Sequence, residues 1–109
     1  MSNDLNSVLI EGNMMRDPVL LNSGLCKIII ASNRYFKKNG KVLEHEVSYF
    51  DVEISHKLVQ FCMKNGRKGK KIKVTGRLRQ DHYDDNDSKL KFPVVVIEAE
   101  HIDFQGKLK

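Results

Sequence analysis

The clearest chemical pattern in this sequence is an alternation of basic and apolar side chains that ends at an aromatic residue. The basic positions are Lys71, Lys73, Arg77 and Arg79, and the aromatic position is Tyr83. A period of two is typical of a strand with one face in a core and the other in water. Cations can bind phosphates and an aromatic ring can stack on an unpaired base, so this face has the chemistry of a groove for single-stranded nucleic acid. The same pattern also fits a solvated strand without a ligand.

Charge and composition favour an anionic partner without identifying one. The chain has 109 residues, which predicts one domain over residues 1–109, and 19 basic against 14 acidic side chains give a formal charge of +5. The sequence pI is about 9.3. No apolar run approaches the roughly 18 residues of a membrane span, and the N-terminus has no signal-peptide pattern. Cys26 and Cys62 lack metal-type spacing and are expected to be buried free thiols, which suits a reducing cytoplasm.

The order of predicted elements favours an all-β fold with one short helix. Strand-like segments are expected at residues 8–10, 19–21, 25–32, 47–55, 70–83, 90–97 and 102–104. Residues 28–30 are β-branched throughout and are expected to be buried on both faces. Asn39-Gly40 predicts a turn with positive φ. This order is that of a five-stranded OB-fold Greek-key barrel, whose exposed face binds oligonucleotides.

Two local features refine this prediction. Apolar residues recur at helical spacing over residues 56–65, with Ser55 as the expected cap and Asn65-Gly66 as the expected left-handed end. Along residues 47–55 the alternation predicts that Phe50, Val52 and Ile54 point into the core. Tyr49 is therefore expected to face solvent.

Four short motifs occur in order along the chain and carry a resemblance. They are Gly12-Asn13-Met14 with Asp17-Pro18, Ile30-Ala31-Ser32-Asn33-Arg34, Tyr49-Phe50-Asp51-Val52, and Gly76-Arg77-Leu78 with Tyr83 downstream. From position 6 to about position 104 the sequence resembles the bacterial single-stranded DNA-binding protein family. The resemblance implies an OB-fold core, usually a homotetramer, that wraps single-stranded DNA without cofactor, metal or catalysis.

The resemblance also implies positions for DNA contacts. The stacking positions would be Phe36, Tyr49 and Tyr83. The cations expected along the strand path are Lys71, Lys73, Arg77, Arg79, Lys89 and Lys91, extended by Arg34, Lys37 and Lys38 around the first hairpin turn.

The sequence departs from the family pattern at three places. Ser55 stands where the family commonly has a further aromatic residue, so one stacking platform is expected to be missing. His56 stands where glycine is usual. The family normally continues to an acidic tip that recruits other proteins, whereas residues 106–109 are basic, so we expect either a truncated sequence or a tailless member.

Competing motifs are weaker. Residues 66–69 match the Gly-x-x-Gly loop of KH domains in letters, but a strand rather than a helix is expected to follow. The acidic run at residues 84–87 lacks the glycine and glutamate of a calcium-binding EF-hand loop. The four histidines show no zinc-pair spacing, and no nucleophile, base and acid form a recognisable catalytic set. We therefore do not expect an enzyme.

Three functions remain open at this stage. The first is a cytoplasmic, nucleoid-associated protein that coats single-stranded DNA during replication, recombination and repair, with replication or repair proteins as possible partners. The second is a primosomal or replication-restart protein of the same fold that bridges protein partners and DNA. The third is an RNA-binding OB module.

Overall fold

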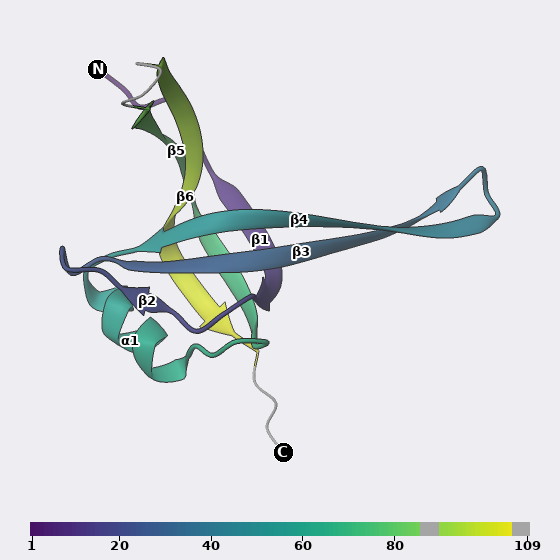
Figure 1. Ribbon diagram of the computed structural model, residues 1–109, viewed down its shortest axis with the longest axis horizontal. Coiled ribbons are helices and arrows are strands. Elements are labelled where there is room, and N and C mark those ends of the chain that lie inside the picture. The colour runs from purple at the N-terminus through teal and green to yellow at the C-terminus, as the bar shows by residue number, and fades with distance from the viewer. Residues whose placement is uncertain (86–89, 106–109) are drawn as a thin grey trace.

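The computed structural model describes residues 1–85 and 90–105, with side chains described over 1–81 and 94–105. Six strands and one helix follow one another along the chain (Figure 1). They are β1 (Val8–Met14), β2 (Val19–Leu20), β3 (Cys26–Lys38), β4 (Val42–Ile54), α1 (Lys57–Asn65), β5 (Lys71–Asp85) and β6 (Leu90–Phe104).

Five of the strands close into a barrel. The order around it is β1-β5-β6-β4-β3, and β3 returns to β1 through the pairs Asn13↔Ala31 and Met14↔Ile30. The β4–β6 pairing is parallel, whereas the other pairings are antiparallel. The two-residue strand β2 adds to the edge of β3. The five-stranded barrel predicted from the sequence is therefore confirmed.

The core follows from the period-two patterns. Ile28 and Ile30 of β3 point inward and are fully buried, while Ile29 between them is only partly buried, so the expectation of burial on both faces is wrong. Position 29 lies on the outer side of the barrel, where its side chain stays in part accessible to solvent. The other large buried aliphatic side chains are Met14, Val52, Ile54, Ile72, Val74, Ile97 and Ile102.

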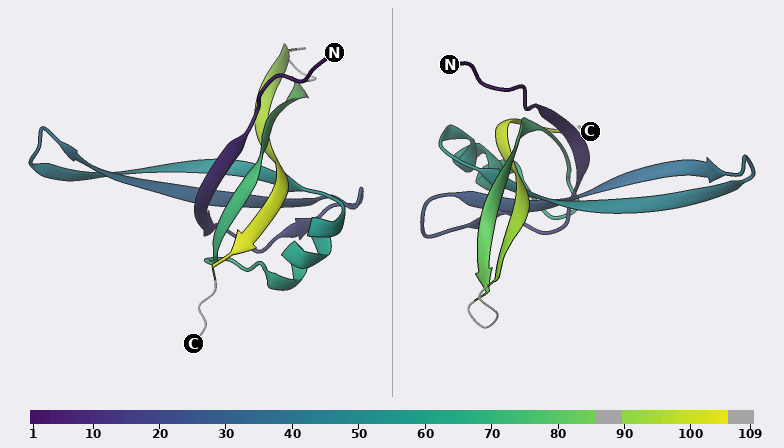
Figure 2. Two further views of the ribbon diagram at one scale, coloured as in Figure 1. Left: turned by 180° about the vertical axis from the view of Figure 1, so that it is seen from behind. Right: turned by 90° about the horizontal axis from the view of Figure 1, so that it is seen from above.

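Helix α1 lies across one end of the barrel (Figure 2). Its Cys62 side chain is completely buried. Cys26 is buried as well, and both thiols are free, as the sequence predicted. Burial, followed by the neighbouring Cys26, raises the pKa of the Cys62 thiol to about 12, so it stays protonated at neutral pH.

Both expected ends of the helix are wrong. Ser55 does not cap it, because the N-cap residue is His56 with φ 57° and no side-chain cap hydrogen bond. Gly66 is extended, with φ −80° and ψ 142°, and its N–H donates to the carbonyl of Cys62 at 2.7 Å. A side chain at Gly66 would meet that carbonyl oxygen at 2.8 Å and Met14 at 3.2 Å. Close packing, rather than a left-handed backbone, therefore requires glycine here.

Two hairpins extend beyond the barrel as arms that run in different directions (Figures 1 and 2). The β3–β4 arm continues to the pair Lys38↔Val42, and its turn has the positive φ predicted for Asn39 and Gly40, at 55° and 73°. The β5–β6 arm continues to Asp85↔Leu90. Both arms are longer than the sequence predicted. Along the β3–β4 arm the side chains of residues 33–47 are exposed or partly buried, so no buried face marks these strands in the sequence.

Candidate nucleic-acid interface

The register of the β3–β4 arm divides its side chains into two faces. Directly opposed residues point to the same side, and successive residues alternate, so odd-numbered positions share one side and even-numbered positions the other. We call the odd-numbered side of the arm the aromatic face. It consists of Asn33, Tyr35 and Lys37 on β3 and Leu43, His45, Val47 and Tyr49 on β4.

Exposed rings dominate the aromatic face. Tyr49 is 61% exposed, as its phase predicted. Tyr35 is 63% exposed, and its ring stacks on His45 with centroids 4.5 Å apart and planes 9° from parallel. A hydrogen bond of 2.8 Å joins His45 Nε2 to Asn33 Oδ1 and orients the imidazole. Within residues 33–49 this face carries no carboxylate, but the next position on the same side of β4 beyond Tyr49 is the exposed Asp51.

Phe36 lies on the opposite side of the arm. It is half-buried, the guanidinium carbon of Arg34 lies 4.7 Å from its ring centroid, and Glu44 is its partner in register. Arg34 also pairs with Glu46 at 3.6 Å. Phe36 was assigned by resemblance and stays a prediction, and the carboxylates of Glu44 and Glu46 lie on its side of the arm. Lys37 and Lys38 are exposed near the end of the arm.

The basic positions at the start of β5 are exposed as predicted. Lys71 and Lys73 point to solvent while Ile72 and Val74 are buried. Lys73, however, is flanked by Glu11 on β1 and Asp103 on β6 in the ladder. A phosphate at Lys73 would therefore meet two acidic neighbours, whereas Lys71 lies opposite the neutral Asn13.

A bulge between Thr75 and Gly76 interrupts the alternation of β5. Beyond it Leu78 is 44% exposed, so the expected burial of one strand face ends at Gly76. The reason is that β5 leaves the barrel here to form an arm. The side-chain amide of Asn6 donates to the carbonyl of Leu78 and accepts from its N–H, at 2.9 Å each. These bonds extend the β1–β5 ladder to a residue that precedes the start of β1.

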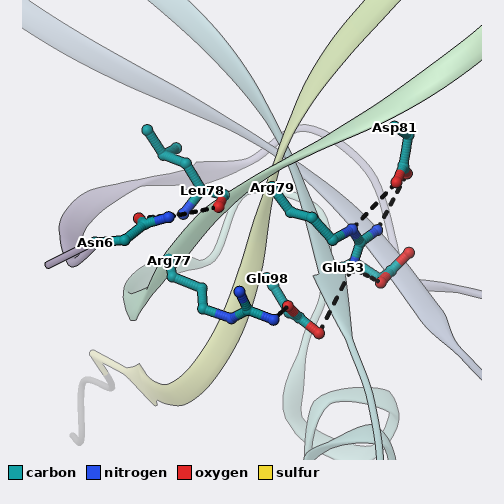
Figure 3. A network of polar contacts seen from close by, with 7 residues as sticks. All are labelled: Asn6, Glu53, Arg77, Leu78, Arg79, Asp81 and Glu98. Atoms are coloured by element: carbon teal, nitrogen blue, oxygen red, sulfur yellow. Dashed lines mark hydrogen bonds and ion pairs between the residues drawn. The ribbon is translucent and has the colours of Figure 1, made fainter. Parts of the chain in front are cut away.

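Arg77 and Arg79 lie against carboxylates from three strands (Figure 3). Arg79 contacts Glu53 Oε1 at 2.7 Å, both oxygens of Asp81 at 3.1 Å and Glu98 Oε2 at 3.5 Å. The hydrogen bonds to Glu53 and then to Asp81 raise the pKa of Arg79 above its usual value. Arg77 Nη2 lies 2.6 Å from the buried Oε1 of Glu98, although that contact lacks the alignment of a hydrogen bond. Phosphates must compete with these carboxylates, and the assignment of both arginines to DNA stays a prediction.

Three predicted contact residues cannot be placed by their side chains. Lys89 lies outside the described residues. Tyr83 and Lys91 belong to the β5–β6 ladder, opposite Phe92 and Asp84 respectively, but their side chains are outside the described part. Their roles stay predictions.

The sequence prediction missed Tyr35 and His45. Their signal was available, because Tyr35 has the same parity as Tyr49 and the Asn39-Gly40 turn sets the register of the two strands. Residue 36 was preferred because the resemblance pointed to it. No set of three or more His, Cys, Asp or Glu residues is grouped for metal binding among the side chains described, those of residues 1–81 and 94–105. Within the same residues no helix has the length and apolar character needed to cross a membrane.

A closed barrel of this topology with an exposed aromatic arm defines an OB-fold protein of the oligonucleotide-binding class. The model of the single-strand binding protein family matches residues 5–105. The chain therefore belongs to the single-strand binding protein family.

Individual relatives agree with this assignment. Single-stranded DNA-binding protein 2 of Chlorobaculum tepidum is 34% identical, over 97% of this chain and 74% of its own length. The single-stranded DNA-binding protein of Helicobacter hepaticus is 37% identical, over 73% of this chain and 49% of its own length. A solved Plasmodium falciparum SSB complex with ssDNA superimposes with a TM-score of 0.83 at 20% identity, covering 97% of this chain and 99% of that chain. The structural likeness supports the fold.

Proposed function

We propose that this chain binds single-stranded DNA with little sequence preference and shields it during replication, recombination and repair. The observation that carries the proposal is the exposed Tyr49 at the base of the aromatic face of an OB-barrel arm. An aromatic ring at such a position stacks on any base, because every base has a π-face. The names of the relatives point to the same ligand.

Cations supply the second part of the mechanism. Lys37, Lys38 and Lys71 are exposed, and none of them joins an ion pair with another described side chain, so among the predicted contacts they are the cations that phosphates reach with the least competition. Each neutralised phosphate releases condensed counterions, which favours binding without sequence readout. The mechanism is binding alone and involves no catalysis.

Self-association is part of this proposal. On its side away from β5, strand β1 pairs with β3 only at Asn13 and Met14, so residues 8–12 present an open edge among the described residues. Leu9 on this segment is 70% exposed. An open edge with an exposed apolar side chain favours pairing with a second copy of the chain. We propose a homotetramer, located in the cytoplasm with the nucleoid, that replication or repair proteins can join.

A titration with poly-dT of graded length at several salt concentrations tests the function. Log affinity is expected to fall linearly with log salt, with a slope of about −0.7 per phosphate neutralised. Saturation is expected at one long occluded stretch for every four chains. A slope near zero would refute the electrostatic mechanism. Weak binding of short DNA at one site per chain would favour the replication-restart alternative.

The variant Tyr49→Ala tests the stacking contact. Because the ring is exposed, the melting temperature of the variant is expected to stay within a few degrees of that of the parent. Its binding free energy for oligo-dT is expected to weaken by about 1–3 kcal/mol. Phe50→Ala is the matched control, since Phe50 is adjacent in sequence but packs against the core, and it is expected to lose about 2–3 kcal/mol of stability. Calorimetry and fluorescence anisotropy measure the two effects. A Tyr49→Ala protein that melts early and binds normally when folded would contradict the assignment.

A further inference from the structure

The Tyr35–His45 pair has the geometry of a preformed stacking surface. The planes of the two rings are nearly parallel, 9° apart, and each ring covers one face of the other. Tyr35 is nevertheless 63% exposed, so much of its surface remains in water. The hydrogen bond from His45 to Asn33 restricts rotation of the imidazole. A ring that is already held in place loses little conformational entropy when a ligand stacks on it.

The position of the pair places it on a path with Tyr49. Tyr49 lies opposite Ala31, and Tyr35 follows four residues further along β3. At about 3.3 Å per residue, this is roughly 13 Å along the arm on the same side. A nucleic acid strand that stacks on Tyr49 and continues along the arm would therefore pass the pair.

The two sides of the arm differ in the carboxylates that they carry. Glu44 and Glu46 lie on the even-numbered side, where Arg34 pairs with Glu46. The aromatic face carries Lys37 and no carboxylate. Arg34 and Lys38 also lie on the even-numbered side, so the sides differ in the presence of carboxylates, and a polyanion on the aromatic face meets none between residues 33 and 49.

We propose that Tyr35, held by His45, is a second base-stacking platform for single-stranded DNA, reached after Tyr49 along the β3–β4 arm. The inference rests on the proposed function and adds a contact residue to it. It also gives the arm an aromatic platform in a chain that has Ser55 where the family resemblance implies an aromatic residue.

The test combines Tyr35→Ala with a series of dT oligonucleotides of increasing length. Affinity for the longer oligonucleotides is expected to fall about 5- to 100-fold, as for loss of one stacked base. The shortest bound oligonucleotides, which reach Tyr49 alone, are expected to lose nothing. Tyr35→Phe keeps the ring and is expected to bind as the parent does. Val42→Ala, an exposed apolar position on the opposite side of the same arm, is the matched control and is expected to leave affinity unchanged.

The outcomes separate this inference from the proposed function. Normal affinity of Tyr35→Ala, together with weakened binding by Tyr49→Ala, would overturn the second platform and leave DNA binding intact. If the parent protein itself does not bind oligo-dT, the proposed function is wrong. The pair could instead only stiffen the arm as a cross-strand contact. Photo-crosslinking of the parent to dT that carries 5-iododeoxyuridine decides this point, because a platform crosslinks at Tyr35, and absence of that crosslink would overturn the inference.

Discussion

Replacing Gly12 with alanine is expected to open the barrel and lower its free energy of unfolding by at least about 3 kcal/mol. A Cβ at Gly12 would overlap the carbonyl oxygen of Ala31 and lie 2.9 Å from its carbon. Both are backbone atoms that cannot rotate away, so β3 must move from β1. Only two residue pairs join these strands, and one of them contains Ala31. Because Ala31 also pairs with Tyr49, the same displacement reaches the base of the aromatic face.

Gly40→Ala is the matched control for this substitution. Gly40 lies at the tip of the β3–β4 arm with φ 73°, and nothing lies within 4 Å of its added Cβ. Only the left-handed backbone opposes alanine there, at a cost of about 1 kcal/mol. Urea unfolding followed by circular dichroism measures both variants. If Gly12→Ala loses no more stability than Gly40→Ala, β1 and β3 can move apart at Gly12 at little energetic cost, and the prediction is wrong.

The barrel was predictable because its signals are local. Phe50 and Val52 point to the core side of β4, and Ile72 and Val74 to the core side of β5. Both placements follow from the period of two with burial on one side. The bulge after Thr75 was not predictable, since it is defined by the register of β5 against β6. The first strand was expected over residues 8–10, but β1 continues through Gly12 to Met14. Glycine serves there for close approach of β3, which depends on contacts distant in sequence.

The candidate site was predictable where it depended on one strand. Parity alone places Tyr49 in solvent. The partners of Arg79 were not predictable, because Glu53 and Glu98 come from β4 and β6 and are brought to it by the parallel pairing of those strands. A basic stripe in the sequence therefore did not reveal which of its cations are already neutralised.

Replacing Arg79 with alanine is expected to lower the free energy of unfolding by about 2–4 kcal/mol. Glu53 is 9% exposed and lies beside Glu98 in the parallel ladder, so loss of Arg79 leaves a buried carboxylate next to a second one without its closest cation. Most of the loss is the desolvation of Glu53 without a partner rather than the strength of the ion pair itself. The double variant Arg79→Ala with Glu53→Gln removes that charge and is expected to recover most of the stability.

Arg34→Ala is the control for Arg79, because it also removes an arginine from an ion pair. Its partner Glu46 lies 3.6 Å away, and the two side chains are 69% and 58% exposed. Exposed pairs of this kind contribute well under about 1 kcal/mol. Thermal unfolding of the parent, the two Arg79 variants and Arg34→Ala measures these effects. It distinguishes a buried ion-pair network from a surface ion pair.

The same Arg79→Ala protein decides whether this arginine also meets DNA. If the carboxylates hold it, the folded variant keeps the salt dependence of the parent on oligo-dT, since no phosphate contact is lost. If Arg79 neutralises a phosphate, as the basic stripe in the sequence predicts, the slope of log affinity against log salt becomes shallower by about 0.7. A variant with unchanged stability and a shallower slope would show that phosphate, rather than Glu53, is the partner that matters. We expect the opposite, because the guanidinium already contacts carboxylates on three strands.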